Sequence, residues 1–306
     1  MNVGSGIRML RSHPRLRLVP VGVVLATLAA LGVVAGTTPA SSAGYSAKVT
    51  NSTDTAATGG AFTCATAVSQ DVASNTALFD YPFTDASQSA PANAADISGK
   101  GNKGTYVGTG TTDSTTPLAC PRDTGAAYTL DGKTSYVYGP AVTAANSPTA
   151  FTLEVWFTTT QYGGKLFTYG NQSTTASGTY DRHVYLNNAG RLVFGVYNGG
   201  ALVITSPLAY NDGKWHHMAL TFTTAYVATM YVDGAVVASG TLAAAESHAG
   251  YWRIGYDTLG GAWPGSGTTP SGAAYNPFFL GSLRYAAVYT TVLTAAQIAS
   301  DYAAGH

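Results

Sequence analysis

Short segments in which apolar and polar residues alternate recur along the chain from about residue 77 onward. Residues 151–157 are the clearest case: their apolar side chains fall on one face of an extended strand, and Glu154 and Trp156 share the other face. Similar segments occupy residues 192–197, 218–222, 230–232, 252–256 and 279–286. Many short strands separated by turn signals are typical of an all-β sandwich or barrel.

Two dipeptides predict how some of these strands connect. Asp131-Gly132 follows one short strand and precedes residues 136–138, and Asp-Gly is a strong hairpin signal. We therefore expect residues 136–138 to be the partner strand of a hairpin. Asp233-Gly234 predicts a second hairpin in the same way.

The end of the chain is the one segment that the sequence predicts as a helix. Thr294 fits an N-cap and Gln297 the N3 position of a capping box. Ile298 and Tyr302 then lie four residues apart on one face, and Gly305 fits a C-terminal stop. We expect one short C-terminal helix.

The first 43 residues are typical of a secretory signal peptide. Four arginines precede an apolar run at residues 18–35, and small residues follow at 41–43. We expect cleavage after Ala43; the alternative is an uncleaved membrane anchor, since the run is close to the length of a span. No second apolar run is long enough to span a bilayer, so we expect a secreted or extracellular protein, released or associated with the cell surface.

The charge of the remaining chain argues against one class of partner. The first 43 residues hold four of the fifteen basic residues and none of the fifteen acidic ones, which leaves a net charge of −4 on residues 44–306. A nucleic-acid partner would require a basic face, so we expect none.

The chain contains two cysteines, Cys64 and Cys120. An even number in an exported chain favours one disulfide, which would stabilise the fold by roughly 4 kcal/mol in the chain-entropy model. The alternative is two buried thiols. We expect an N-terminal arm over residues 44–76, without a helical period and tethered by this bond, followed by a single domain over residues 77–306.

An ordered set of motifs resembles the laminin-G-like, concanavalin A-like jelly-roll domains of secreted bacterial proteins. It covers about residues 77–306. The motifs are, in order, Tyr81-Pro82-Phe83, the turn at residues 96–102, Phe151 to Phe157, Tyr180-Asp181-Arg182-His183, residues 188–192, residues 212–217, Tyr231 to Gly234, residues 250–255, residues 279–283 and residues 293–298.

This resemblance implies a jelly-roll β-sandwich and leaves the function open, because the fold hosts lectins, hydrolases, adhesion modules and spacers. We expect a non-catalytic recognition module, with a glycan or cell-surface polysaccharide as its partner. One alternative is a structural or adhesion module that binds protein. A second is a glycoside hydrolase.

Four residues are candidates for ligand binding. Tyr180, Asp181 and Arg182 follow a Gly/Thr/Ser-rich loop, where they would contact sugar hydroxyls at the rim of the sandwich. The alternative is an internal ion pair of Arg182 with Glu154 or Asp257, since arginine pairs rigidly with carboxylates in either role. Trp263 lies in a Gly/Pro/Ser loop, where we expect it to be exposed and to stack on a sugar.

Calcium is the cofactor that the resemblance implies, because some members of the family bind one Ca²⁺. Its oxygen ligands would come from Asp96, Asn102 and Asp257, each of which also fits a turn former. His216 and His217 are poor candidates for a shared metal, because adjacent residues of a strand point to opposite faces.

The sequence argues against an enzyme. Glycoside hydrolysis usually requires two carboxylates at a defined separation. The chain has only two glutamates, Glu154 and Glu246, far apart in the sequence. No Gly-x-Ser-x-Gly elbow or zinc-ligand helix occurs. We therefore expect no catalytic residues, with an unrecognised pair of aspartates as the remaining route to hydrolysis.

Overall fold

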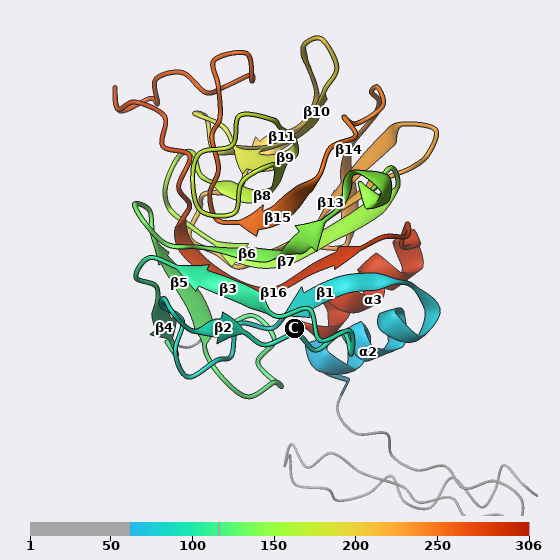
Figure 1. The fold of residues 1–306 in the computed structure, drawn as a ribbon. Coiled ribbons are helices and arrows are strands. Elements are labelled where there is room, and N and C mark those ends of the chain that lie inside the picture. The colour runs from blue at the N-terminus through green and yellow to red at the C-terminus, as the bar shows by residue number, and fades with distance from the viewer. Residues whose placement is uncertain (1–61, 116, 306) are drawn as a thin grey trace, which may run out of the picture. The chain divides into compact units, whose positions relative to one another are not determined.

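A computed structural model describes residues 62–115 and 117–305 of the 306-residue chain (Figure 1). The predicted signal peptide and most of the predicted arm lie outside the described residues. The described chain forms two eight-stranded antiparallel sheets. Hydrophobic residues between the two sheets form the main core, which includes Leu153 and Val155 from one sheet and Val184 and Phe194 from the other. The predicted all-β jelly-roll sandwich is confirmed.

The first sheet is called the helix-side sheet here, because α2 (Cys64–Ser74) and α3 (Ala295–Ala304) pack on its outer face. Its strands, in spatial order, are β14 (Ala235–Thr241), β13 (Val227–Val232), β12 (His216–Phe222), β7 (Phe151–Thr158), β16 (Leu280–Tyr289), β5 (Ala127–Asp131) and β4 (Thr111–Asp113), with β1 (Ala77–Tyr81) paired to β16.

The second sheet is called the loop-side sheet, because the loop between β15 and β16 packs on its outer face. Its strands, in spatial order, are β11 (Ala201–Ala209), β10 (Arg191–Tyr197), β9 (Tyr180–Leu186), β8 (Lys165–Gly170), β15 (Gly250–Ile254), β6 (Tyr136–Val142), β3 (Gly104–Val107) and β2 (Asn93–Ala94). A short 3-10 helix, η1 (Ala144–Asn146), follows β6.

The C-terminal helix α3 begins as the sequence predicts. The Thr294 side chain accepts a hydrogen bond from the backbone of Gln297, and the Gln297 side chain accepts one from the backbone of Thr294. This capping box satisfies backbone donors that a helix start leaves without partners. Ile298 is buried against the helix-side sheet.

The helix α2 was not predicted, and the expectation of an arm without helical structure is wrong for residues 64–74. Thr63 caps its start by accepting a hydrogen bond from the backbone N–H of Thr66. Cys64, Val68 and Asp71 recur at helical spacing and are buried. The buried face of α2 is made largely of small residues, so the helical spacing of its apolar residues is hard to recognise in the sequence.

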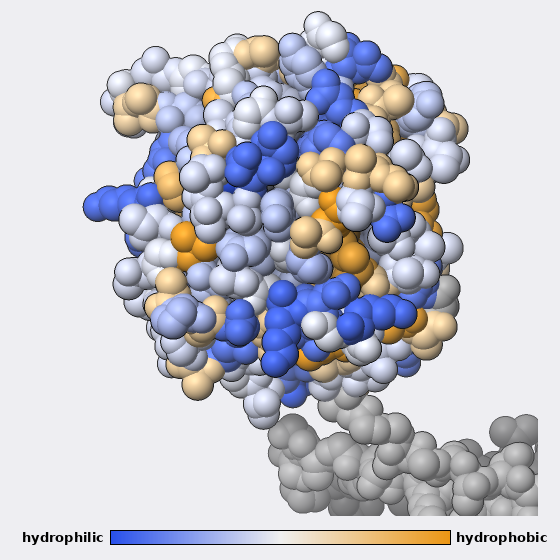
Figure 2. All heavy atoms as spheres, in the orientation of Figure 1, coloured by the Kyte–Doolittle hydropathy of each residue, from blue (hydrophilic) through white to orange (hydrophobic). Residues whose placement is uncertain are grey.

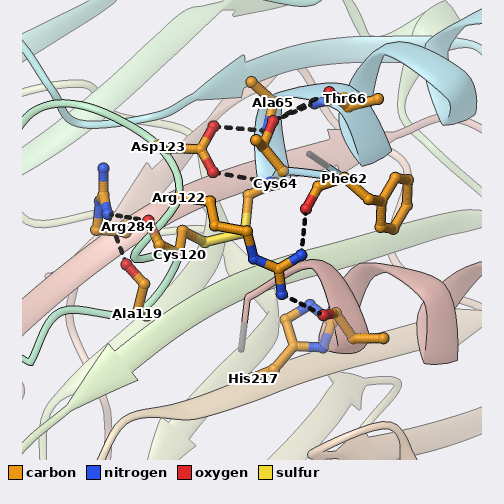
Figure 3. Close-up of a disulfide and its surroundings, with 12 residues drawn as sticks. Phe62, Cys64, Ala65, Thr66, Ala119, Cys120, Arg122, Asp123, His217 and Arg284 are labelled. Carbon is orange, nitrogen blue, oxygen red and sulfur yellow. Dashed lines mark hydrogen bonds between the residues drawn. A yellow bond between two sulfur atoms is a disulfide. The ribbon is translucent and has the colours of Figure 1, made fainter. Parts of the chain in front are cut away.

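The predicted disulfide between Cys64 and Cys120 is present, with the two Cα atoms 5.8 Å apart (Figure 3). Asp123 reinforces the connection, because its carboxylate accepts hydrogen bonds from the backbone N–H groups of Cys64 at 2.8 Å and Ala65 at 3.1 Å. A carboxylate at the start of a helix is favourable, since the helix dipole is positive there. The disulfide and Asp123 together fix the start of α2.

The hairpin expected at Asp131-Gly132 is wrong. β5 belongs to the helix-side sheet and β6 to the loop-side sheet, so the turn carries the chain from one sheet to the other. The Asp131 carboxylate accepts hydrogen bonds from the backbone N–H groups of Lys133, Thr134 and Ser135, which curls the chain back on itself. The second prediction is correct, because β13 and β14 pair through the turn at Asp233-Gly234.

The chain has a low content of charged residues, and its surface reflects this. On the face in Figure 2, weakly polar residues predominate and strongly hydrophobic residues occur in small separate areas. Within residues 62–115 and 117–305, neither helix is long and apolar enough to cross a lipid bilayer.

Candidate functional site

The loop between β15 and β16 folds over the outer face of the loop-side sheet. Trp263 anchors it: the indole contacts the rings of His183, at 4.3 Å between centroids, and Tyr185, at 6.5 Å. Gly195 permits this approach, because a Cβ atom at that position would lie 2.8 Å from the indole. The Tyr185 hydroxyl also donates a hydrogen bond to the carbonyl of Pro264.

A pocket of about 360 Å³ opens beside this anchor. Tyr180 from β9 and Tyr197 from β10 are partly exposed in it, and Trp263 forms part of its wall. Within the described chain, neither tyrosine hydroxyl has a hydrogen-bond partner. The remaining lining residues are Gly178, Thr179, Glu246 and Ala262. The pocket therefore combines aromatic faces, free hydroxyls and one carboxylate.

The structure corrects the expected exposure of Trp263. The side chain is 2% exposed, because the loop is folded down with its tryptophan against the sheet. Tyr180 lies at the start of β9 and is partly exposed, and the structure brings these two candidate residues together in one pocket.

Asp181 and Arg182 lie in the interior, and neither side chain has an exposed atom. They form an ion pair at 2.6 Å. The Arg182 guanidinium lies 4.6 Å from the centre of the Tyr169 ring and donates hydrogen bonds to the Ser147 hydroxyl and the Pro148 carbonyl. This arrangement is the internal ion pair considered above, with Asp181 in place of Glu154 or Asp257 as the partner.

The buried pair positions one wall of the pocket. Arg182 donates a hydrogen bond to the carbonyl of Glu246 at 2.6 Å, and Asp181 accepts one from the N–H of the same residue at 2.8 Å. Burial raises the pKa of Asp181 to about 6, although the charge of Arg182 acts in the opposite direction. Asp181 and Arg182 are therefore positioning residues for Glu246 and are not exposed to a ligand.

The three residues expected to bind calcium do not form one site. Asp96 accepts hydrogen bonds from the backbone of Asp80, Ser98 and Asn102 and from the Ser98 hydroxyl, which uses the acceptor positions of its carboxylate. Asp257 belongs to a different network, in which Ser177, Thr258 and Arg253 contact its carboxylate. These residues stabilise turns and loops, and the set does not fit a bound calcium ion.

The side chains of the two adjacent histidines lie on opposite faces of β12, as expected. His216 is 2.8 Å from an oxygen of Asp233 and 3.1 Å from an oxygen of Asp212. His217 lies on the other face of β12, 3.9 Å from Glu154. Burial alone would lower the pKa of His216, but the hydrogen bonds and charges of Asp233 and Asp212 raise it above its ordinary value of 6.5.

The contribution of His216 to stability should therefore depend on pH. A raised pKa means that the contribution is fully present below about pH 6.5 and is lost as the pH rises through the pKa of the folded state. We expect His216→Gln to lower the free energy of unfolding by about 1 kcal/mol more at pH 5.5 than at pH 9. The difference is modest because solvent screens the charges of the partly exposed aspartates. Urea unfolding of both proteins at the two pH values measures this difference, and an equal loss at both would contradict it.

A group of carboxylates lies under the two helices, with Asp71 and Glu154 buried and Asp301 half-buried. Asp71 of α2, Glu154 of β7 and Asp301 of α3 place carboxylate oxygens within 4.8 Å of one another. Burial is the main cause that raises the pKa of Asp301 to about 8, and the charge of Asp71 is the second. Burial is also the main cause that raises the pKa of Glu154 well above its ordinary value. On β1, the pKa of Asp80 is raised to about 8, mainly by burial and secondly by the charge of Asp96.

Comparison with known proteins identifies the family. A profile of the concanavalin A-like lectin/glucanases superfamily, Laminin_G_3, matches residues 130–299. The chain belongs to this superfamily. A comparison with curated proteins found no significant match.

Two solved structures with TM-scores above 0.5 show the same fold at low sequence identity. The binding domain of Paraclostridial Mosquitocidal Protein 1 is 12% identical, with a TM-score of 0.53, and the alignment covers 76% of this chain and 52% of that one. The botulinum neurotoxin serotype C1 binding domain is 10% identical, with a TM-score of 0.52 and the same coverage. Domain 4 of AbnA, a GH43 extracellular arabinanase from Geobacillus stearothermophilus, in complex with arabinotriose, is 15% identical, with a TM-score of 0.48 and coverage of 74% and 98%. The chain thus spans about half the length of the two toxin chains.

Proposed function

We propose that this protein is a secreted, non-catalytic carbohydrate-recognition module, and that the pocket of Tyr180, Tyr197, Trp263 and Glu246 holds the sugar. The observation that carries this proposal is the meeting of aromatic side chains, free tyrosine hydroxyls and a carboxylate in one pocket. Sugar rings stack their apolar faces on aromatic rings, and polar groups then fix the hydroxyls. The volume of about 360 Å³ falls within the range of small-molecule sites.

The family context is consistent with this proposal. The superfamily includes lectins by name. The same fold occurs in botulinum neurotoxin type C, whose cell entry depends upon interaction with two ganglioside molecules. Because these proteins share only 9% sequence identity with the chain, the ligand must be found from this pocket and not from theirs.

Export to an oxidising compartment is a second part of the proposal. The predicted signal peptide and the Cys64–Cys120 disulfide both support it, because disulfides persist mainly outside the cytoplasm. The mass of the protein recovered from culture medium tests it: cleavage after Ala43 should remove the first 43 residues.

The pocket makes a testable prediction about Tyr197. We expect the oxidised protein to bind one polysaccharide class on a glycan array, and Tyr197→Ala to weaken this binding about tenfold with little change in melting temperature. An aromatic contact contributes about 1–1.5 kcal/mol, and 1.4 kcal/mol corresponds to a factor of ten. Calorimetric titration with the selected glycan measures the affinity.

Tyr162→Ala is the matched control, because Tyr162 is an exposed tyrosine outside this pocket. Binding that survives Tyr197→Ala and Tyr180→Ala unchanged would locate the glycan elsewhere. No binding to any glycan would favour a protein-binding adhesion module. Release of reducing ends from a bound polysaccharide would instead favour the hydrolase.

A further inference from the structure

The pocket of Tyr180, Tyr197, Trp263 and Glu246, called the aromatic pocket here, contains one charged side chain. Among the described residues that line it, no lysine, arginine or histidine accompanies Glu246. Glu246 is partly exposed, and its hydrogen bonds within residues 62–115 and 117–305 all involve its backbone N–H and carbonyl. Its carboxylate has no hydrogen bond or ion pair in that part of the chain. The pocket therefore presents an unpaired negative charge.

The backbone of Glu246 is held in place from the interior. Asp181 accepts a hydrogen bond from its N–H at 2.8 Å, and Arg182 donates one to its carbonyl at 2.6 Å. Because both polar backbone groups face this buried ion pair, the side chain is the part of Glu246 that lines the pocket. Arg182 has a φ of 51°, a left-handed conformation that persists in a non-glycine residue only where the surroundings fix it. The protein thus sets the position of the charge before a ligand arrives.

The basic groups near the pocket lie behind its wall. Arg182 is 0% exposed and is paired with Asp181. Lys165 is also 0% exposed, with Nζ 2.8 Å from Nδ1 of His183 and 5.6 Å from the centre of the Tyr180 ring. Burial lowers the pKa of Lys165 well below its ordinary value of 10.5. Neither cation lines the pocket, so neither competes with a ligand for direct contact with the Glu246 carboxylate.

The other walls of the aromatic pocket favour a ligand that has both a positive charge and hydroxyl groups. A cation is attracted to the faces of aromatic rings, and Tyr180 and Tyr197 are partly exposed here. The hydroxyls of both tyrosines lack hydrogen-bond partners within the described chain, so each can bond a ligand hydroxyl. A quaternary ammonium group would match the carboxylate and the rings but would leave both hydroxyls unused.

We propose that the aromatic pocket selects a sugar with a positively charged amine, a 2-amino-2-deoxyhexose such as glucosamine, and that Glu246 is the specificity-determining residue. This inference rests on the proposed function and adds the charge of the ligand to it. The ammonium group would pair with the carboxylate in a charge-assisted hydrogen bond. N-acetylation removes that charge, and the carboxylate of a uronic acid would be repelled by Glu246.

Three trisaccharides that differ in charge test this selection: those of glucosamine, N-acetylglucosamine and galacturonic acid. Calorimetric titration of the oxidised protein should give about tenfold tighter binding of the glucosamine trimer than of its N-acetylated form. The galacturonic acid trimer should bind most weakly. Raising the salt concentration should reduce the preference, because salt screens charges that solvent can reach.

Glu246→Gln assigns the preference to one carboxylate. The variant keeps the backbone hydrogen bonds to Asp181 and Arg182, so we expect little change in melting temperature. It should reduce the preference for the glucosamine trimer to less than about twofold and should improve binding of the galacturonic acid trimer. Asp212→Asn is the matched control. It also removes one negative charge, from an exposed residue outside the pocket, and should keep the wild-type preference.

The outcomes separate this inference from the proposed function. Binding of all three trisaccharides with equal affinity, or a preference that Glu246→Gln leaves unchanged, would overturn the inference while the carbohydrate-recognition module stands. Loss of the preference in Asp212→Asn as well would trace it to the overall charge and not to the pocket. Choline that binds as tightly as the glucosamine trimer would overturn the sugar as the ligand. Absence of binding to these trisaccharides and to every glycan on an array would overturn the proposed function itself.

Discussion

Replacement of Arg182 by methionine is expected to lower the free energy of unfolding by about 3–5 kcal/mol, the usual effect of removing one partner of a buried ion pair. The change leaves Asp181 buried without its counter-charge at 2.6 Å. It also removes the hydrogen bonds to Ser147 and to the carbonyl of Glu246. Methionine keeps much of the volume, so the loss arises mainly from the unpaired polar groups.

Urea unfolding of the oxidised protein measures this effect, with Arg191→Met as the control. Arg191 is exposed at the start of β10, and a surface substitution of this kind usually changes stability by less than about 0.5 kcal/mol. A ligand-contacting arginine would behave differently: Arg182→Met would then abolish binding and leave the unfolding midpoint in place. That result would return Arg182 to the role that its position in the sequence first indicated.

The regular part of the fold was predictable because its signals are local. Alternation in residues 151–157 reflects the two faces of β7, and the capping box at Thr294 and Gln297 is satisfied by atoms three residues apart. The hairpin at Asp233-Gly234 likewise depends on two residues with positive φ. Such features require no knowledge of the rest of the chain.

The failed hairpin at Asp131-Gly132 shows where local signals stop. The same dipeptide begins a turn between two sheets when the aspartate side chain binds the next backbone N–H groups. Which sheet receives β6 depends on its pairing with β3 and β15, which are distant in the sequence. A dipeptide has no information about those partners.

For a similar reason, the sequence showed only parts of the aromatic pocket and of the carboxylate group under the helices. Tyr197 and Glu246 are 49 positions apart and enter the aromatic pocket only through the packing of β10 and a loop. The carboxylate group of Asp71, Glu154 and Asp301 collects residues from three separate elements, α2, β7 and α3. One signal was present: Glu154 lies on the outer face of a strand that has no exposed side. A charged residue buried in that way requires a partner, and the sequence does not say which.

Trp263 gives the second large expected effect. Trp263→Ala should lower the free energy of unfolding by about 3–5 kcal/mol, as large-to-small substitutions in a core do. An exposed Trp263 that stacks on a sugar, as the sequence predicts, would lose affinity in this variant at constant melting temperature. The structure predicts that both fall, because the indole holds the loop on His183 and Tyr185 and also forms a wall of the pocket.

Two further variants separate the anchoring role of Trp263 from a direct contact with the ligand. Trp263→Phe keeps an aromatic ring on the sheet and should recover more than half of the lost stability. Gly195→Ala leaves the tryptophan unchanged but places a methyl group 2.8 Å from it and 2.7 Å from Val203, so it should destabilise by about 1–3 kcal/mol and weaken glycan binding in parallel. If Gly195→Ala displaces the loop without affecting binding, the sugar contacts Tyr180 and Tyr197 alone. If Trp263→Ala retains the wild-type unfolding midpoint, the loop is not anchored by its tryptophan, and the aromatic pocket described here does not exist in solution.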